Sequence, residues 1–338
     1  VFLELTAACN LRCRHCRAEA SEIPSENELT TRQILSTAEK IRSFCDPIII
    51  LTGGEPLVRD DFFTIAEYCG SIFTRVALAT NGTLLDDKTA ARIKNSGISR
   101  VSISIDGAGR ETHDRFRGAD GSFDSALRGC RTITDAGLSL QINSTLTREN
   151  CSGLNDILNL ALTLKADAFH LFVLVPVGCG AEIAEDQRIP PEQLNEILKG
   201  LLRNSIKYGD KIHIRATCAP QYYRLIMESA SRKELDPGKF SRNGMQAVSG
   251  GCLAGSSVCF ISRKGDVQPC GYMPVKAGNL TTEDFFAIWN KSEVFEKLRN
   301  PALLKGKCGT CGFRSFCRGC RARALAKTGD FLSEDPDC

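Results

Sequence analysis

Strands and helices alternate through residues 1–210, and this alternation constrains the fold more than any other feature. Six apolar runs rich in β-forming residues each precede a helical stretch. The expected strands are Phe2–Thr6, Pro47–Leu51, Arg75–Ala79, Arg100–Ile105, Leu138–Ser144 and Ala168–Val175. The expected helices are Thr31–Phe44, Asp61–Tyr68, Asp86–Ser96, Ser122–Ala136, Gly153–Leu164 and Pro191–Tyr208. Such βαβ units form parallel sheets, and six units are too few for a closed eight-unit barrel. We therefore expect an α/β fold with a partial (β/α)6 barrel of TIM type.

The pattern changes after residue 210. A further strand-like run, Lys211–Ala216, leads into a polar stretch, and the rest of the chain is rich in Cys and Gly with one expected helix, Glu283–Leu298. A small module of this composition usually obtains its core from bound metal. We expect a barrel at 1–210, a connector at 211–250 and a Cys-rich iron–sulfur module at 251–338.

Overall composition limits the partners. The net charge is +3 over 338 residues, which predicts no broad nucleic-acid-binding surface. No apolar run reaches the ~18 residues of a membrane span. The chain starts at Val1, inside an expected strand, so we expect it to be part of a longer protein. Seventeen cysteines fall largely in metal-ligand spacings, which favours a cytoplasmic location over a disulfide framework.

Three of these cysteines, Cys9, Cys13 and Cys16, form a C-x3-C-x2-C triplet directly after the first expected strand. A structural zinc site would need four ligands. A [4Fe–4S] cluster bound by three thiolates instead keeps an open position on one iron. The triplet therefore predicts a cluster that binds a small molecule.

A second motif, Gly53-Gly54-Glu55-Pro56, follows the second expected strand. Together with the triplet, it makes residues 1–210 resemble the radical S-adenosylmethionine (SAM) enzymes. The resemblance implies that the triplet binds the cluster, that the open iron binds SAM, and that reductive cleavage of SAM gives a 5′-deoxyadenosyl radical. The implied cofactor-binding residues are Gly53, Gly54 and Glu55 for the methionine amino group, and Ser104, Asp106 and Asn81 at later strand ends.

The C-terminal module contains eight more cysteines, a number sufficient for two sets of four ligands. Their order resembles the SPASM domain, which holds auxiliary iron–sulfur clusters in many radical SAM enzymes. The resemblance implies an inner cluster on Cys252, Cys259, Cys270 and Cys320, and an outer cluster on Cys308, Cys311, Cys317 and Cys338. A zinc knuckle and a single auxiliary cluster remain as alternatives.

Cys179 and Cys218 each lie just past a late strand and are candidates for the substrate cavity. Cys218 is also a candidate iron ligand or thiol donor, and buried structural roles are the alternative for both residues. The other four cysteines, Cys45, Cys69, Cys130 and Cys151, are expected to be small buried apolar side chains.

Finer motifs, such as Thr217-Cys218-Ala219-Pro220 and Gly251-Cys252-Leu253-Ala254-Gly255, resemble the haem-biosynthesis branch of these enzymes. The chain differs from that branch at Gln221, where a histidine is expected, and at Cys179, where an arginine is expected.

The resemblance implies oxidative decarboxylation of two propionates of iron-coproporphyrin III to vinyls, giving haem b. The implied partners are the iron-porphyrin and a low-potential donor such as ferredoxin or flavodoxin. Arg215, Arg224 and Arg242 are candidates for binding the propionates, since Arg pairs with carboxylates bidentately. Alternatives are side-chain processing of didecarboxysiroheme toward haem d1, a peptide-modifying maturase, and a non-enzymatic iron–sulfur carrier.

Overall fold

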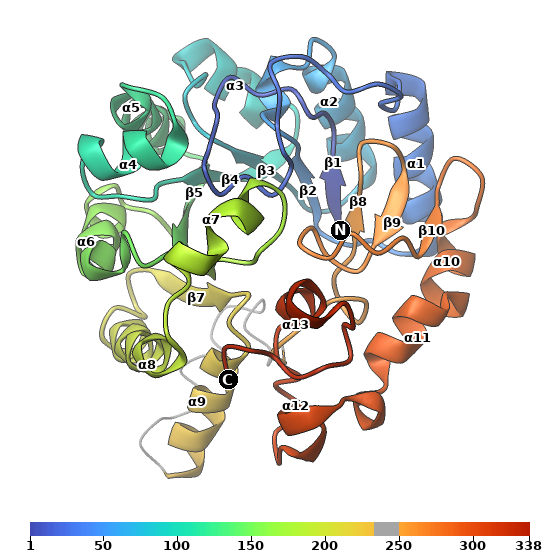
Figure 1. The fold of residues 1–338 in the computed structure, drawn as a ribbon. Helices are drawn as coiled ribbons and strands as arrows, with labels where there is room; N and C mark the ends of the chain where they lie inside the picture. Colours follow the sequence, from blue (N-terminus) through green and yellow to red (C-terminus); the bar gives the residue numbers. More distant parts are fainter. Residues whose placement is uncertain (233–249) are drawn as a thin grey trace.

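A curved parallel sheet forms the framework of the protein (Figure 1). The computed structural model describes residues 1–232 and 250–338. Within these, neighbouring strands from β1 to β7 pair in parallel in chain order. The strands are β1 Phe2–Glu4, β2 Ile49–Thr52, β3 Val76–Thr80, β4 Ile98–Ser104, β5 Ser139–Leu146, β6 Ala168–Val173 and β7 His213–Thr217. The expected α/β partial barrel is therefore confirmed, with one parallel strand more than six. The run 211–216, which we assigned to the connector, forms β7 because it pairs with β6.

Helices cover the outer side of this sheet (Figure 1). They are α1 Thr31–Phe44, α2 Phe62–Ile72, α3 Asp87–Asn95, α4 Arg110–Arg117, α5 Ser122–Asp135, α6 Leu154–Thr163, α8 Pro191–Lys207 and α9 Gln221–Ser231. The helix α7 (Cys179–Gln187) lies apart from this layer, beside the loop that carries Cys16. The helix α1 illustrates why these segments fold. A capping box of Thr30 and Gln33 satisfies its first turn, and Ile34 and Ile41 bury its apolar face. Among the described helices, none is both long and apolar enough to span a membrane.

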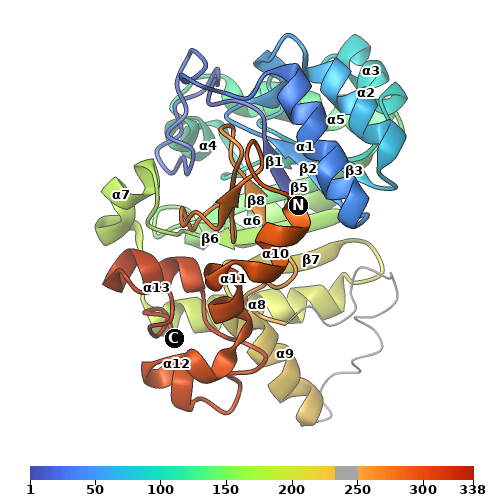
Figure 2. The ribbon, with the colours of Figure 1, turned by 90° about the vertical axis from the view of Figure 1, so that its right-hand side faces the viewer.

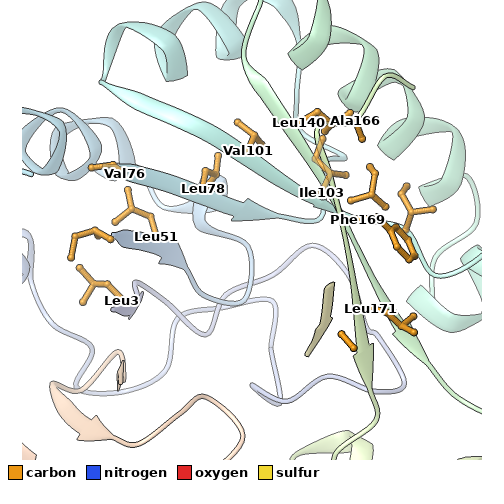
Figure 3. Close-up of a cluster of buried hydrophobic side chains, with 14 of the residues drawn as sticks. Leu3, Leu51, Val76, Leu78, Val101, Ile103, Leu140, Ala166, Phe169 and Leu171 are labelled. Atoms are coloured by element: carbon orange, nitrogen blue, oxygen red, sulfur yellow. The ribbon is translucent and has the colours of Figure 1, made fainter. Parts of the chain in front are cut away.

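The barrel core lies between the sheet and these helices. Figure 3 shows apolar side chains from successive strands, including Leu51, Leu78, Val101 and Phe169, packed in one continuous cluster. Parallel sheets that are covered in this way are built from Val, Ile and Leu rather than from alternating polar residues. Each fully buried side chain of this kind stabilises the fold by roughly 1.5–3 kcal/mol.

The C-terminal module continues the same sheet. Its strand β8 (Phe260–Ile261) pairs in parallel with β1, and β9 (Asp266–Gln268) and β10 (Gly278–Asn279) follow in antiparallel order. The remaining helices are α10 Phe285–Lys291, α11 Glu293–Arg299, α12 Gly306–Thr310 and α13 Arg321–Thr328. The expected helix 283–298 is thus two helices, because Ser292 between them has extended backbone. Figure 2 shows this module beside β1 and α9.

Candidate active site

The cysteine triplet lies in the loop after β1, and the glycine pair after β2 packs against the same segment. The Gly54 N–H donates to the Thr6 carbonyl oxygen over 2.7 Å. A Cβ atom at Gly54 would lie 2.3 Å from the Ala8 carbonyl oxygen, so a larger residue would push the two turns apart. The Gly-Gly motif therefore sets how close the β2 turn approaches the segment that leads into Cys9.

Glu55 is fully buried, and its carboxylate already has several donors. It accepts hydrogen bonds from the Thr80 hydroxyl at 2.8 Å, the Asn81 N–H at 2.7 Å and the Leu57 N–H at 3.1 Å. Burial raises the pKa of Glu55 above its ordinary value, although these donors act against that rise. The side chain thus ties the ends of β2 and β3 together, and binding of a methionine amino group by Gly53, Gly54 and Glu55 stays a prediction.

Asn81 joins this arrangement to the triplet loop. Its side-chain amide donates to the Asn10 side-chain oxygen at 2.8 Å and lies 3.9 Å from the Cys9 sulfur. The same side chain accepts from the Thr83 N–H at 2.9 Å. Asn81 therefore positions the cysteine loop, and its predicted contact with the cofactor stays a prediction.

A buried ion pair, Asp106 with Arg117, lies on the other side of the triplet. The Arg117 guanidinium, from α4, is 2.5 Å from the Asp106 carboxylate and 3.7 Å from the Cys13 sulfur. Burial opposes ionisation of Asp106, but Arg117 holds its pKa below the ordinary value. The structure thus places Asp106 in a pair with an arginine, and Ser104 precedes it at the end of β4.

Sequence reasoning missed Arg117, although it is the cation nearest to Cys13 in the described site. Burial raises the pKa of Cys13, and Arg117 opposes this by stabilising the thiolate. An arginine held against a thiolate is well placed to offset the negative charge of a thiolate-bound cluster.

Cys179 lies against the triplet loop, at the start of α7. Its N–H donates to the Cys16 carbonyl oxygen at 2.9 Å. The preceding Gly178 has φ of 58°, and a Cβ atom there would lie 2.5 Å from the same oxygen. The structure therefore places Cys179 beside Cys16, and its predicted role in a substrate cavity is not tested by these contacts.

The structure brings three of the expected inner ligands together. Cys252, Cys270 and Cys320 are electrostatic neighbours of one another. Cys218 joins them, since its thiol hydrogen-bonds to that of Cys320. This contact lowers the pKa of Cys320 to about 7 and raises the pKa of Cys218, because one proton is shared by the pair. The fourth expected ligand, Cys259, lies apart from this group, near the amino group of Val1 and Cys45.

The expected outer ligands also come together. Cys338 has Cys308 and Cys311 as neighbours, and Cys317 has Cys338 and Cys308. The Arg321 guanidinium donates to the Cys308 sulfur at 3.4 Å, which is an outer contact suited to a bound thiolate.

These donor sets, which consist of thiols, suit iron–sulfur clusters, because each iron of a cube takes one thiolate ligand.

Comparison with known proteins identifies the family to which the chain belongs. The model of the radical SAM superfamily matches residues 3–161, and that of an iron–sulfur cluster-binding domain, SPASM, matches residues 252–321. The AdoMet-dependent heme synthase of Methanosarcina barkeri is 44% identical over 99% of this chain and 94% of its own length. The protein belongs to the radical SAM heme synthase family.

Other relatives agree with this family assignment. The AdoMet-dependent heme synthase of Oleidesulfovibrio alaskensis is 41% identical over 99% of this chain and 85% of its own length. The pre-heme d1 synthase of Dinoroseobacter shibae is 34% identical over 100% of this chain and 85% of its own length.

The fold is also similar to that of Streptococcus suis SuiB, solved with bound S-adenosylmethionine. The TM-score is 0.77 and the sequence identity is 16%, and the match covers 100% of this chain and 76% of the SuiB chain. As a radical SAM protein with a SPASM domain, the chain uses SAM, a [4Fe–4S] cluster and auxiliary iron–sulfur clusters.

In this heme synthase family member, the residue after the triplet lies near the inner cysteine group. Arg17, the residue after Cys16, stacks its guanidinium 4.4 Å from the Phe260 ring centre and pairs with Glu4 at 3.2 Å. A Cβ atom at Gly271, next to Cys270, would lie 3.3 Å from Arg17, and the Arg17 charge acts on Cys270. Arg17 is therefore close to both cysteine groups.

Tyr272 follows Cys270 by two residues, and its hydroxyl is buried. Burial raises the pKa of this hydroxyl, and Cys218, Cys270 and Asp106 add to that rise.

The candidate propionate-binding arginines have other surroundings. Arg224, on α9, lies 3.8 Å from the Cys338 sulfur and 3.6 Å from Glu228. Arg215, on β7, lies near the rings of His170 and His213 and, after burial, contributes to the lowered pKa of both. Arg242 lies outside the described residues. Propionate binding by Arg215 or Arg224 stays a prediction.

Proposed function

We propose that the protein converts iron-coproporphyrin III to haem b by oxidative decarboxylation of two propionates. The supporting observation is 44% identity over 99% of the chain to a protein named AdoMet-dependent heme synthase. We also propose that a low-potential donor such as ferredoxin or flavodoxin supplies electrons, and that the protein works in the cytoplasm, where thiols stay reduced.

The proposed chemistry needs one electron acceptor for each side chain. A [4Fe–4S] cluster held by Cys9, Cys13 and Cys16 would, with SAM, supply the radical that abstracts a hydrogen atom. Loss of a hydrogen atom from the β-carbon of a propionate leaves a radical on that carbon. CO2 is released when the bond between the α-carbon and the carboxylate carbon breaks. A vinyl group then forms once one further electron leaves the side chain.

A cluster bound by the inner cysteine group would be suited to receive that electron. Arg17, the residue after Cys16, stacks on the Phe260 ring at 4.4 Å and is a charged neighbour of Cys270. We therefore propose that the substrate binds between the radical source and this electron acceptor.

Residues of the first site hold the radical source in place. Glu55 and Asn81 fix the turn and the cysteine loop through buried hydrogen bonds. Arg117 keeps a positive charge beside Cys13. A rigid, buried site of this kind excludes water from a reactive radical.

A second candidate function is modification of a peptide. The mycofactocin maturase MftC of Mycolicibacterium smegmatis is 32% identical over 99% of this chain and 81% of its own length, so relatives of this architecture include a maturase. The higher identity to heme synthases favours the tetrapyrrole.

The test uses protein reconstituted with iron and sulfide and kept anaerobic. Incubation with dithionite, SAM and iron-coproporphyrin III should give haem b and about two 5′-deoxyadenosines per macrocycle. With deuterium on the propionate β-carbons, the label should appear in 5′-deoxyadenosine by mass spectrometry. Reactions without SAM or without dithionite are the controls. SAM cleavage that leaves the porphyrin and the label unchanged would refute the proposal and favour another tetrapyrrole or a peptide.

A further inference from the structure

We propose that Cys218, from the end of the barrel, and not Cys259 is the fourth thiolate of the inner auxiliary cluster, with Cys252, Cys270 and Cys320. The proposal concerns the ligands alone and holds for any substrate. It replaces the set expected from sequence, in which all four ligands came from the C-terminal module.

Cys259 is directed into the apolar core. It is 1% exposed. It immediately precedes β8, and its carbonyl oxygen accepts the Phe2 N–H at 3.0 Å, which fixes its place beside β1. Its ionisable neighbours are the Val1 amino group and Cys45, and none of the three inner cysteines is among them. Bringing its sulfur to the inner group would break the pairing of β8 with β1.

Cys218 is directed toward the inner group. It directly follows β7, and Cys320 and Cys270 are among its ionisable neighbours. Arg323 and Asp335 also bridge Cys218 to Cys320 through hydrogen bonds to the two backbones. Its backbone has φ of 57°, in the left-handed region that residues other than glycine rarely adopt. This conformation turns the chain sharply between β7 and α9 and is the kind of local strain that persists where the surroundings hold a functional side chain in place.

A buried salt-bridge network holds this turn. The Arg323 guanidinium donates to the Cys218 carbonyl oxygen at 2.6 Å and pairs with Asp335 and Asp337, each at 3.0 Å. The Asp335 carboxylate also accepts the N–H of Cys320 at 2.7 Å. One ion-pair network therefore fixes the backbone of both cysteines, one from the barrel and one from the module.

Gln221 belongs to the same network. Its side-chain amide donates to the Asp335 carboxylate and to the Asp337 carbonyl oxygen, both at 3.1 Å. Gln221 is one of the two positions at which the chain differs from the haem-biosynthesis branch. Its amide supports the Cys218 turn from the first turn of α9, and the N–H of the histidine expected there could donate to the same oxygens.

The donor set has a chemical consequence. Four thiolates close all positions of a [4Fe–4S] cube, so the inner cluster transfers electrons and does not bind substrate. The cluster then joins the last parallel strand to the C-terminal module.

The test compares C218A with C259A, which remove one thiol each. Both are made in a background in which Cys9, Cys13 and Cys16 are alanine, so that only auxiliary clusters contribute iron and electron paramagnetic resonance (EPR) signals. Iron, zinc and acid-labile sulfide per chain, circular dichroism and the EPR spectrum of the reduced protein are measured anaerobically. We expect C218A to lose or alter one of two cluster signals, and C259A to keep the iron content and spectrum of the background protein.

A second variant guards against misfolding of C218A. C218S can keep the cluster through a serinate oxygen, which should shift the g values of one signal in a folded protein. The proposal is overturned if C218S and C218A keep the parent spectrum, if C259A loses iron as strongly as C218A, or if zinc occupies the group.

Discussion

At the scale of single residues, charge around the triplet is set by one buried arginine. Arg117 contacts both Asp106, which is fully buried, and Cys13, which is partly buried. Its pKa is raised by Asp106 and Cys13 against the effect of burial, so it stays protonated at every accessible pH. Its positive charge is therefore a fixed component of the site.

We predict that Arg117→Met destabilises the protein by about 3–5 kcal/mol, because it leaves Asp106 buried without its partner. It should also lower iron bound at the triplet and shift the EPR signal of that cluster. Anaerobic urea unfolding and EPR with and without SAM measure both effects. Arg117→Lys, which keeps the charge, is the matched control and should retain more of each. Wild-type stability in Arg117→Met would contradict the ion-pair argument.

A second prediction at this scale concerns pH. Burial lowers the pKa of His113 from 6.5 to about 4, and its ring accepts the Asp106 N–H at 3.2 Å. Below pH 6.5, His113 binds a proton in the unfolded chain but stays neutral in the folded chain. The contribution of His113 to stability is therefore fully present above pH 6.5 and falls by about 1.4 kcal/mol per pH unit toward pH 4.

His113→Gln tests this, since its side-chain oxygen can accept the same N–H without titrating. Unfolding midpoints of both proteins should converge as pH falls from 6.5 to 4.5, with the wild type losing stability faster. Parallel pH profiles would show that His113 does not titrate as described.

The sequence predicted some of these residues and not others for a physical reason. Cys9, Cys13 and Cys16 are recognisable because their spacing is local. Arg117 reaches Cys13 across 104 positions of sequence, and no local pattern distinguishes it from other arginines of a polar helix. Cys218 was recognised as unusual by its place after a strand, but its grouping with Cys320 depends on how the module docks.

At the scale of elements, the turn after β2 is the contact that aligns the triplet loop. It packs glycine backbone against Ala8, and no space remains for a side chain. Long apolar periodic segments such as α1 and α5 were predicted closely. The short polar helix α4, which positions Arg117, was missed because its amphipathic pattern spans only Arg110–Arg117.

We predict that Gly54→Ala displaces the β2 turn from the triplet loop. An added Cβ atom 2.3 Å from the Ala8 carbonyl oxygen forces a backbone shift, with a cost of about 1–3 kcal/mol. SAM affinity should fall, as measured by equilibrium dialysis on the reconstituted protein. Gly153→Ala is the matched control, since nothing lies within 4 Å of its Cβ position and its φ is −87°. Equal SAM affinity in the two variants would argue against this packing.

At the scale of the whole molecule, the barrel and the module share one sheet. Ten strands run from β10 to β7, and β1 lies in the interior of this order, between β8 and β2. The sequence predicted the barrel class from its repeating units. It did not predict this junction, because β8 has two residues and is too short to give an alternating pattern.

We predict that a chain ending at residue 250 does not fold as an independent barrel. It would lack β8, expose the edge of β1 and leave Arg17 without Phe260. Size-exclusion chromatography should show aggregation, and iron bound at the triplet should be low. The full chain prepared in parallel is the control, and a monomeric, SAM-binding fragment 1–250 would refute the prediction.

The pairing of Phe2 with Phe260 has a consequence for biosynthesis. The strand that contains Phe2 cannot pair with its second neighbour until the chain has been synthesised past Phe260. Contacts between such distant positions slow folding, and an uncovered strand edge favours association with other nascent chains. Loading of metal into the first cysteine loop is therefore expected to be completed only after β8 has been made and has paired with β1.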